Sequence, residues 1–475
     1  MTHALYSYYG DDFTGSTDVL EGLAVAGVRS VLFLGSPSEQ HWRKFSDCQA
    51  FGIAGDSRSR TPEWMDEQLP GIFARLRSFG APIVHYKTCS TFDSSPAIGS
   101  IGRAMEIGRD ILQSPFVPVV VAAPHLKRYV VFGNLFAAAG KEIYRIDRHP
   151  TMRQHPVTPM YEADLRLHLA RQSPLRVGLI DLPTLRSGRG AEALSARLAT
   201  GDDAVLFDGA ELEDVEQTGQ ILWELACKTP LFAIGSSGLT YGLAAAWKAQ
   251  SITDAPLAMS GPATTGSSPT ATGSVAPTAG SVAPATGSVA PTTGPVTPAT
   301  RSVVAVDRLL VMSGSCSPIT ERQIAHALRN GYEGIAMDMA EFADPATSVS
   351  AMESTVNRTI AALRRTGKVI VYSALGPLPP GVVARGDSLG RQIGAMLREI
   401  IRTSGLRRVV LAGGDTSSHA VAQLGLYALT WVAATQPGAP LCRAHSDTPE
   451  LNGLELVLKG GQVGSEDFFE RVRIG

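Results

Sequence analysis

The chain has 475 residues, 44% of them hydrophobic and 18% charged, with 42 Lys and Arg against 44 Asp and Glu. This much apolar material excludes a disordered chain and suffices for roughly two or three domains. The net charge of −2 argues against a broad surface for nucleic acid or an anionic membrane, so we expect neither as a partner.

The cysteines and the start of the chain indicate a cytoplasmic protein. The five cysteines lie far apart, their number is odd and no C-x-x-C spacing occurs, so neither a disulfide scaffold nor a zinc ribbon is expected. The first residues turn acidic at Asp11, before the apolar stretch of a signal peptide can form. No apolar run approaches the ~20 residues of a membrane-spanning helix.

Short apolar runs alternate with helix-like stretches along the first 254 residues. The runs are continuously apolar, which is typical of strands covered on both faces of a parallel sheet. The predicted strands are 4–9, 30–34, 81–86, 117–123, 175–180 and 231–235. The predicted helices are 62–79, 97–113, 188–199 and 211–228. Thr61-Pro62 and Ser95-Pro96 resemble an N-cap followed by Pro in the first turn.

Two adjacent carboxylates follow the first predicted strand. Asp11 and Asp12 stand at the strand end, and Thr14 and Gly15 open a helix. Backbone N–H groups at a helix start can hold an anion or a substrate hydroxyl, and carboxylates can accept hydrogen bonds from a polyol or help to hold Mg²⁺. The alternative is a helix N-cap with a spare acid, which is the interpretation we favour for Asp18. We interpret Asp11 and Asp12 as functional.

A second polar loop, KTCSTFDSS, follows the strand predicted at 81–86. It combines a cation, Lys87, with the hydroxyls of Ser90 and Thr91 and the carboxylate of Asp93. Such a mixture suits a hydroxy-acid ligand, although a turn that caps the next helix is the plainer alternative. Cys89 is a poor candidate nucleophile, because no His that could act as its base stands out.

A third segment, around residues 145–160, concentrates cations in a Pro-rich stretch. Arginine forks bind carboxylates and phosphates through two bonds, which favours an anion-recognition loop over a solvated charged loop by a small margin. A metal site is not expected, because the two histidines have no acidic partners in a ligand pattern. The candidate residues are Arg145, Asp147, Arg148, His149, Arg153 and His155, together with Lys127 and Arg128 earlier in the chain.

The segment 255–300 has no charged or aromatic residue and repeats GSVAP with a period of seven from Gly273. Proline in every unit forbids a continuous helix, and nothing large enough to pack recurs. We therefore predict a flexible linker at 255–300 between domains at 1–254 and 301–475.

The second domain repeats the α/β style of the first. Strands are predicted at 308–312, 368–374, 407–413 and 454–461, and a helix begins near Pro318. The sequence thus predicts two α/β lobes with mainly parallel sheets and an active-site cleft between the lobes.

Three glycine- and serine-rich turns follow strands of this second domain. They read SGSCSP from Ser313, AGGDTSS from Ala412 and KGGQVG from Lys459. Small residues let phosphate oxygens approach the backbone, so we predict one shared nucleotide site. No G-x-x-x-x-G-K-[ST] occurs, so the site is not a P-loop. Asp415 beside the second turn could be a general base, a magnesium contact or an N-cap.

DDFTGSTD, SGSCSP, AGGDTS and KGGQVG, in this order across both lobes, resemble the four-carbon acid sugar kinases. The resemblance covers the whole chain except 255–300, and it implies an N-terminal acid-sugar-binding lobe and a C-terminal lobe that binds ATP. For phosphoryl transfer we expect ATP to be used together with Mg²⁺. It implies substrate contacts from Asp11, Asp12, Thr14 and Gly15. It implies nucleotide contacts from Ser313, Ser315, Ser317, Gly413, Gly414, Asp415, Thr416, Gly460 and Gly461.

The loop at Lys87 departs from the pattern K-I-D-S-T-L-R-G-N of members that resemble threonate kinases. Cys89 stands at the Asp position, and Phe92-Asp93 replaces Leu-Arg. This form is more similar to the kinases of 3-oxo acids, namely 3-oxo-tetronate and 3-oxo-isoapionate kinases.

We therefore predict an ATP-dependent kinase that phosphorylates a hydroxyl of a small sugar acid. Lys87, Ser90, Thr91, Asp93, Arg148 and Arg153 are expected to bind substrate, and Asp12 or Asp415 to act as the base. A homodimer is possible. The alternatives are a threonate or erythronate kinase and a non-catalytic metabolite sensor. A nicotinamide-dependent dehydrogenase is disfavoured because GDDFTG lacks the Gly-rich pyrophosphate fingerprint.

Overall fold

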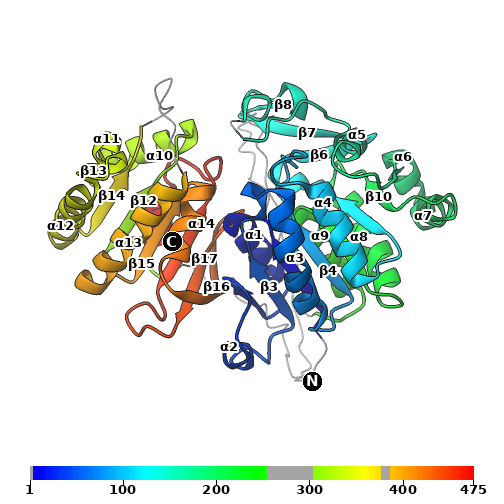
Figure 1. Ribbon diagram of the computed structural model, residues 1–475, viewed down its shortest axis with the longest axis horizontal. Helices are drawn as coiled ribbons and strands as arrows, with labels where there is room; N and C mark the ends of the chain where they lie inside the picture. The colour runs from blue at the N-terminus through cyan, green and yellow to red at the C-terminus, as the bar shows by residue number, and fades with distance from the viewer. Residues whose placement is uncertain (1–3, 156, 254–302, 376–385) are drawn as a thin grey trace, which may run out of the picture.

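The computed structural model describes residues 4–155, 157–253, 303–375 and 386–475, without the side chains of Asp387 and Asp415. Its main feature is one sheet of 15 strands in the order β13-β14-β12-β15-β18-β17-β16-β2-β3-β1-β4-β11-β5-β10-β9. A lobe of helices and strands lies at each end of this sheet (Figure 1). The predicted linker 255–300 lies outside the described residues.

The first lobe holds eight parallel strands with helices on both faces. Its strands are β1 (Tyr6–Gly10), β2 (Ser30–Phe33), β3 (Ala50–Ala54), β4 (Ile83–Lys87), β5 (Val117–Val120), β9 (Val177–Ile180), β10 (Ala204–Phe207) and β11 (Leu231–Gly235). One face carries α1 (Phe13–Val25), α8 (Leu212–Ala226) and α9 (Ser237–Ala249); the other carries α3 (Pro62–Arg77) and α4 (Ile101–Leu112). The shorter helices are α2 (Glu39–Arg43), α5 (Leu165–Ala170), α6 (Leu182–Thr184) and α7 (Gly190–Ala199).

The second lobe adds five parallel strands. They are β12 (Leu309–Ser313), β13 (Glu333–Ala336), β14 (Lys368–Tyr372), β15 (Arg408–Ala412) and β18 (Glu455–Lys459). Its helices are α10 (Pro318–Arg329), α11 (Met339–Ala343), α12 (Ser348–Thr366), α13 (Gly386–Ser404), α14 (Gly414–Ala422) and α15 (Phe468–Ile474).

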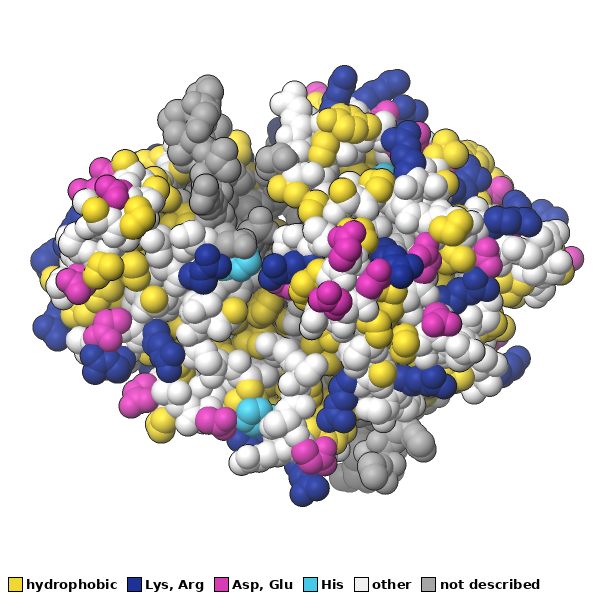
Figure 2. All heavy atoms as spheres, in the orientation of Figure 1, with side chains coloured by type: hydrophobic (Ala, Val, Ile, Leu, Met, Phe, Trp, Pro, Cys, Tyr) yellow, Lys and Arg dark blue, Asp and Glu magenta, His cyan; other side chains and the backbone are white. Residues whose placement is uncertain are grey.

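An antiparallel hairpin joins the two lobes into one sheet. It is formed by β16 (Leu426–Gln436) and β17 (Ala439–Ser446), and it pairs with β18 on one side and with β2 on the other. One apolar core runs across this junction, since Val19 and Leu23 of α1 belong to the same cluster as Met312 and Leu456 of the second lobe. The space-filling view shows the surface hollowed between the lobes (Figure 2).

A separate three-stranded antiparallel sheet lies on the first lobe (Figure 1). It consists of β6 (Arg128–Val131), β7 (Asn134–Ala139) and β8 (Glu142–Arg145). The chain enters it directly from the end of β5 through a single turn at Pro124–Leu126. This sheet therefore stands at the edge where the parallel strands end.

The α/β class and most of the predicted elements are confirmed. The Thr61 hydroxyl caps α3 with Pro62 in its first turn, as predicted. The cap predicted at Ser95-Pro96 is wrong: α4 begins at Ile101, and Ser100 caps it. The strands β3, β10 and β13, the hairpin and the small sheet were not predicted, and the last two depend on tertiary pairing.

The position of α1 depends on a ring that fills the space beside a glycine. Tyr8 of β1 is fully buried, and its hydroxyl donates a hydrogen bond to the Ser16 carbonyl of α1 over 3.1 Å. Gly52 pairs with Tyr8 in the sheet, and a Cβ at Gly52 would lie 2.2 Å from the Tyr8 ring. The missing side chain at Gly52 therefore lets Tyr8 hold the start of α1.

We predict that Gly52→Ala lowers the free energy of unfolding by about 1–3 kcal/mol, because the Tyr8 ring must move. Gly71→Ala is the matched control: Gly71 lies exposed in α3 with nothing within 4 Å of an added Cβ. This control should gain roughly 0.5–1 kcal/mol from the removal of a helical glycine. Urea unfolding of both variants measures the difference, and equal stabilities would contradict the packing argument.

Candidate functional site

The carboxyl end of β1 places two acids at the start of α1. Asp12 is the N-cap of this helix: its Oδ1 accepts the Gly15 N–H over 2.8 Å, and its Oδ2 accepts the Thr14 hydroxyl over 2.5 Å. Asp11 and Asp12 are both buried. Two buried adjacent carboxylates repel each other, so a cation must compensate them.

Arg58 supplies this cation. Its guanidinium donates to both oxygens of Asp11, over 3.1 and 2.6 Å, and to Oδ1 of Asp12 over 3.1 Å. The Asp11 carbonyl accepts the Arg58 N–H over 3.2 Å, which fixes the turn after β3 against β1. Arg58 could not be predicted from the sequence, because β3 was not recognised and nothing local links residue 58 to residue 11.

The two carboxyls have different proton affinities. Burial raises the pKa of Asp11 to about 6, although Arg58 opposes the effect. Burial acts in the same direction on Asp12, but Arg58, the Thr14 hydroxyl, Lys87 and the Gly15 amide outweigh it and hold the Asp12 pKa below 3.8. Asp12 is thus charged at neutral pH, and Asp11 takes up a proton in mildly acidic solution.

Lys87 ends β4 beside the same helix start. Its side chain is buried, and its Nζ lies 3.8 Å from Oδ2 of Asp18. A Cβ at Gly15 would lie 3.1 Å from this Nζ and 2.4 Å from Oδ1 of Asp12, so only a glycine fits there. The structure therefore brings Lys87, Gly15, Thr14 and the acid pair together, as the sequence analysis predicted. Asp18 lies beside Lys87 as well, and the N-cap of α1 is Asp12.

The loop after Lys87 folds around its own hydroxyls. The Thr91 hydroxyl lies 2.5 Å from Oδ1 of Asp93 and 3.0 Å from Sγ of Cys89. The Thr158 hydroxyl approaches the other Asp93 oxygen over 3.3 Å. Phe92 is fully buried and has φ of 56°, a left-handed conformation that costs energy in a residue other than glycine. Ser90, Thr91 and Asp93 all lie at or below 9% exposure, so this loop is built into the lobe.

The structure exposes two of the cations that were predicted to bind substrate. Arg148 and Arg153 have exposed side chains beyond β8, so their role in substrate binding stays a prediction. His149 is buried, and its Nδ1 accepts the N–H groups of Thr151 and Met152 over 3.2 Å each. It therefore shapes the turn rather than serving as a ligand.

In the second lobe, the predicted glycine turns converge. Ser313 ends β12, and Ser317 caps α10 with Pro318 in its first turn. A Cβ at Gly314 would lie 2.3 Å from the Thr416 Oγ1, and one at Gly461 would lie 3.0 Å from the Ser315 Oγ. The turns after β12, β15 and β18 are thus in mutual contact.

Three serines of the first turn leave their hydroxyl protons available. The Oγ atoms of Ser313, Ser315 and Ser317 accept backbone N–H groups two residues further along, over 3.2 to 3.3 Å. A serine hydroxyl that accepts a bond still has one proton to donate. These serines can therefore donate to an anion such as a phosphate.

Lys459 lies beneath these turns and was not among the predicted site residues. It ends β18 with no exposed surface, and its Nζ donates to the Thr320 hydroxyl over 3.1 Å and to the Gly460 carbonyl over 2.9 Å. Burial lowers its pKa to about 7. The Thr320 hydroxyl in turn donates to the Gly461 carbonyl over 3.2 Å, so Lys459 ties the third turn to α10.

The residues around Asp12 on the first lobe and the three turns of the second lobe form two half-sites. These half-sites meet at Gly414. A Cβ at Gly414 would lie 4.0 Å from Oδ2 of Asp12 and 4.0 Å from Oγ1 of Thr14. The start of α14 therefore faces the start of α1 across the two lobes. Gly413 precedes α14 with φ of 115°, a conformation that favours glycine. Asp415 is the second residue of α14, and its side chain lies outside the described part of the chain.

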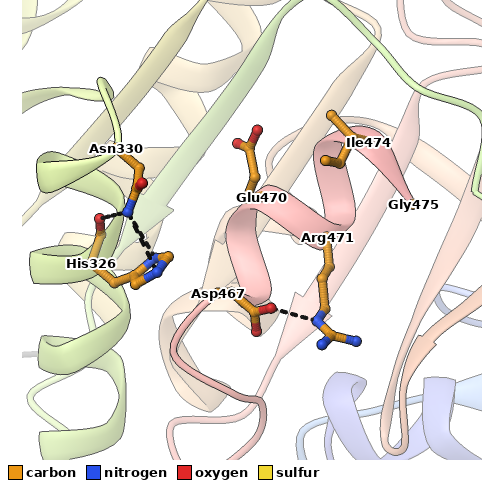
Figure 3. Close-up of a pocket in the computed structure, with 7 residues that line it drawn as sticks. All are labelled: His326, Asn330, Asp467, Glu470, Arg471, Ile474 and Gly475. Atoms are coloured by element: carbon orange, nitrogen blue, oxygen red, sulfur yellow. Dashed lines mark hydrogen bonds and ion pairs between the residues drawn. The ribbon is translucent and has the colours of Figure 1, made fainter.

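A groove of about 470 Å³ lies elsewhere, between α10 and α15 (Figure 3). Its polar groups already have partners: Arg471 donates to Asp467 over 2.8 Å, and Asn330 donates to the His326 carbonyl over 2.8 Å. Glu470 accepts from Arg473 and from the Tyr332 hydroxyl. The groove therefore offers few polar groups that could bind a ligand.

Two known families match the two lobes. A family described as the sugar-binding N-terminal domain matches residues 6–243, and one described as the nucleotide-binding C-terminal domain matches residues 310–469. The chain is 41% identical to a 3-oxo-isoapionate kinase of Paraburkholderia graminis, over 99% of this chain and 94% of that protein. The chain belongs to the four-carbon acid sugar kinase family.

Other relatives agree with this assignment. The chain is 31% identical to a 3-oxo-tetronate kinase of Methylobacterium radiotolerans, over 97% of this chain and 96% of that protein. A solved structure from Salmonella typhimurium, titled a putative tRNA synthase, has a TM-score of 0.70 at 22% identity and covers 98% of this chain and 97% of its own. This last likeness shows the fold alone. As a member of its family the protein is a sugar-acid kinase, a phosphotransferase that uses ATP.

The described residues hold neither a cluster of metal ligands nor a membrane-spanning helix. No three or more His, Cys, Asp or Glu side chains in them gather as metal ligands would. Within the same residues, no helix has the length and apolar character that crossing a membrane requires.

We predict that Lys459→Met changes how stability depends on pH. The folded protein holds Lys459 with a pKa of about 7, whereas the unfolded chain has the ordinary value of 10.5. Between these values the unfolded state binds more protons, so this lysine makes the free energy of unfolding rise with pH from about 7 towards 10.5. The variant loses that rise.

Urea unfolding at pH 7, 8 and 9 measures the difference between the two proteins. Lys248→Met, an exposed lysine of α9, is the control and should follow the wild type. Parallel curves for the wild type and Lys459→Met would contradict the burial of an uncompensated ammonium.

Proposed function

We propose that this kinase phosphorylates a hydroxyl of a 3-oxo acid, with 3-oxo-isoapionate and 3-oxo-tetronate as the candidate substrates. The observation that carries the proposal is the meeting of Asp12 and Thr14 with Gly414, because it places an acid-sugar half-site against a phosphate-binding turn. The substrate class is supported by the names of the relatives at 41% and 31% identity. It is also supported by Cys89 and Asp93 in the loop after β4, since these residues depart from the threonate-kinase pattern.

The proposed nucleotide site follows the three turns of the second lobe. Hydroxyls of the serine turn and backbone N–H groups at the starts of α10 and α14 would hold the phosphates. The residues proposed to contact ATP are Ser313, Ser315, Ser317, Gly413, Gly414, Asp415, Thr416, Gly460 and Gly461. Mg²⁺ bound with the phosphates would offset their charge, and the nearest described carboxylate to the Gly414 turn is that of Asp12.

The proposed acid-sugar site lies on the first lobe. Asp11 and Asp12 would accept hydrogen bonds from substrate hydroxyls, and Lys87 would offset substrate charge. Thr14 and Gly15 would contribute their backbone at the start of α1, and Ser90, Thr91 and Asp93 would form the facing wall.

The reaction forms a bond between the substrate hydroxyl oxygen and the γ-phosphorus and breaks the bond between that phosphorus and the bridging β,γ-oxygen. ADP leaves, and the hydroxyl proton passes to a carboxylate. Asp12 and Asp415 are the candidate acceptors. A base with a low pKa suffices in a loose transition state, because most of the catalysis comes from positioning and charge stabilisation. Asp12 is suited to this role, since its carboxylate is charged at neutral pH.

The setting of the enzyme is also proposed. A cytoplasmic location is supported by the absence of disulfides among the five cysteines, all of which are free. A homodimer is supported by exposed apolar side chains on and after the small sheet, where a protein contact would cover them. These side chains are Phe132, Ile143, Val157, Tyr161 and Leu167, each 47% to 67% exposed. The division into 1–254, 255–300 and 301–475 is proposed as the domain arrangement.

We predict that Asp12→Asn lowers kcat by about 10²- to 10⁴-fold while the KM for ATP changes by less than about threefold, if Asp12 is the base. Asp415→Asn measured in parallel assigns the role, because only the base shows a large loss of turnover with normal ATP affinity. The readout is coupled ADP release with saturating acid sugar. A normal kcat in Asp12→Asn would remove Asp12 as the base.

The function itself is tested by ADP release from the purified protein with ATP and Mg²⁺ over a panel of acids. The panel holds 3-oxo-isoapionate, 3-oxo-tetronate, D- and L-threonate and D-erythronate. We expect selective turnover of a 3-oxo acid. Turnover of threonate or erythronate alone would reject the 3-oxo assignment, and silence with ATP binding intact would favour a non-catalytic sensor.

A further inference from the structure

The turn after β5 brings two further polar side chains to the acid-sugar half-site. β5 lies beside β11 in the sheet, and β11 lies beside β4, so the carboxyl ends of these strands share an edge with Lys87. The chain leaves β5 through the turn Pro124–Leu126 and begins β6 at Arg128. His125 therefore lies in this turn, and Arg128 begins the strand that follows it.

The backbone of the turn is held firmly. Ala123 and Arg128 exchange N–H and carbonyl bonds over 2.9 and 3.1 Å. Lys127 between them has φ of 56° and ψ of 48°, a left-handed conformation that is uncommon for a residue other than glycine. Residues held in such conformations gather at sites of ligand recognition, where their side chains are fixed in advance.

Both side chains have buried polar atoms that lack partners within the described residues. Neither ring nitrogen of His125 has a hydrogen bond, although both are buried. The Nε of Arg128 is also buried without a partner, and its Nη1 reaches only the carbonyls of Leu126 and Lys127, over 2.9 and 3.1 Å. Oδ1 of Asp18 is a third buried atom without a partner. Native proteins rarely leave such groups unsatisfied, so each one needs a partner from outside these side chains, which is either a bound water or a ligand.

These groups face the residues already assigned to the half-site. Asp18 and Lys87 act electrostatically on His125, and Cys89 acts on Arg128. The His125 ring also packs on Tyr241, with 4.3 Å between ring centroids. Burial lowers the pKa of His125, so its ring is neutral at neutral pH and offers one donor and one acceptor. No ion pair neutralises Arg128 among the described side chains, whereas Arg58 is saturated by Asp11 and Asp12.

We propose that Arg128 binds the carboxylate of the acid sugar and that His125 binds its neighbouring oxygen, with Oδ1 of Asp18 accepting a substrate hydroxyl. A guanidinium that lacks an acidic partner matches a planar carboxylate through two bonds, and a neutral imidazole matches a keto or hydroxyl oxygen. The ATP phosphates are the other anions that could reach Arg128, but the turns proposed for them lie on the second lobe. This inference rests on the proposed function, because it names the substrate group that the half-site recognises.

The test compares a substrate with its neutral analogue. The probes are 3-oxo-tetronate and erythrulose, in which a CH₂OH group replaces the carboxylate. We expect Arg128→Gln to raise the KM for 3-oxo-tetronate by about 30- to 1,000-fold, as for loss of a buried charge partner, with KM for ATP within about threefold. The preference of the wild type for the acid over erythrulose should largely disappear. His125→Gln should raise the KM for both probes, because it contacts an oxygen that both share.

Three further measurements make the outcome decisive. Lys141→Gln removes a positive charge from an exposed position in the turn between β7 and β8 and should leave both KM values unchanged. Arg128→Lys should recover part of the affinity, because it keeps the charge and loses the fork. Melting temperatures identify any variant that fails to fold. If Arg128→Gln does not fold, Arg128→Lys takes its place in the comparison.

An unchanged KM for the acid in Arg128→Gln, or an equal rise in the KM for ATP, would overturn the proposal. Failure of the proposed function is a distinct result, in which the wild type phosphorylates no acid of the panel. In that case equilibrium binding of 3-oxo-tetronate without ATP decides the site: binding by the wild type but not by Arg128→Gln supports it, and equal binding or none overturns it.

Discussion

The compensation of two adjacent buried carboxylates by one guanidinium is the interaction on which the site depends. Without Arg58, Asp11 and Asp12 could not both be buried as carboxylates at the carboxyl end of β1. The burial of an uncompensated charge costs far more free energy than an ordinary hydrogen bond gains. The pairing fixes the turn after β3 to the turn after β1. It also leaves Asp12 charged and Asp11 easier to protonate, so two chemically equal residues acquire different properties.

The rest of the site is arranged by the sheet. Parallel strands that end at one edge gather Lys87, the turn after β5 and the start of α1 in the first lobe, and the three small-residue turns in the second. Each half-site presents helix starts and backbone N–H groups, and its lysine, Lys87 in the first lobe and Lys459 in the second, is buried. This rigid arrangement suits phosphoryl transfer, in which positioning supplies most of the rate enhancement.

Local patterns revealed the motifs, and tertiary pairing determined what lies beside them. The acid pair, Lys87 and the glycine turns could be predicted because each follows an apolar run at a strand end. Arg58, Lys459 and His125 could not, since their significance comes from neighbours distant in sequence: residue 11 for Arg58, Thr320 for Lys459, and Asp18 with Tyr241 for His125. Arg148 and Arg153 attracted attention through charge alone, and the fold exposes both.

The hairpin β16–β17 holds the two lobes together independently of the chain segment that connects them. Because its strands pair with β2 on one side and β18 on the other, hydrogen bonds of the sheet and a shared core fix where the second lobe sits. The orientation of the lobes therefore does not require the predicted linker at 255–300. Weak selection on the length and composition of this segment is consistent with its repeated GSVAP units.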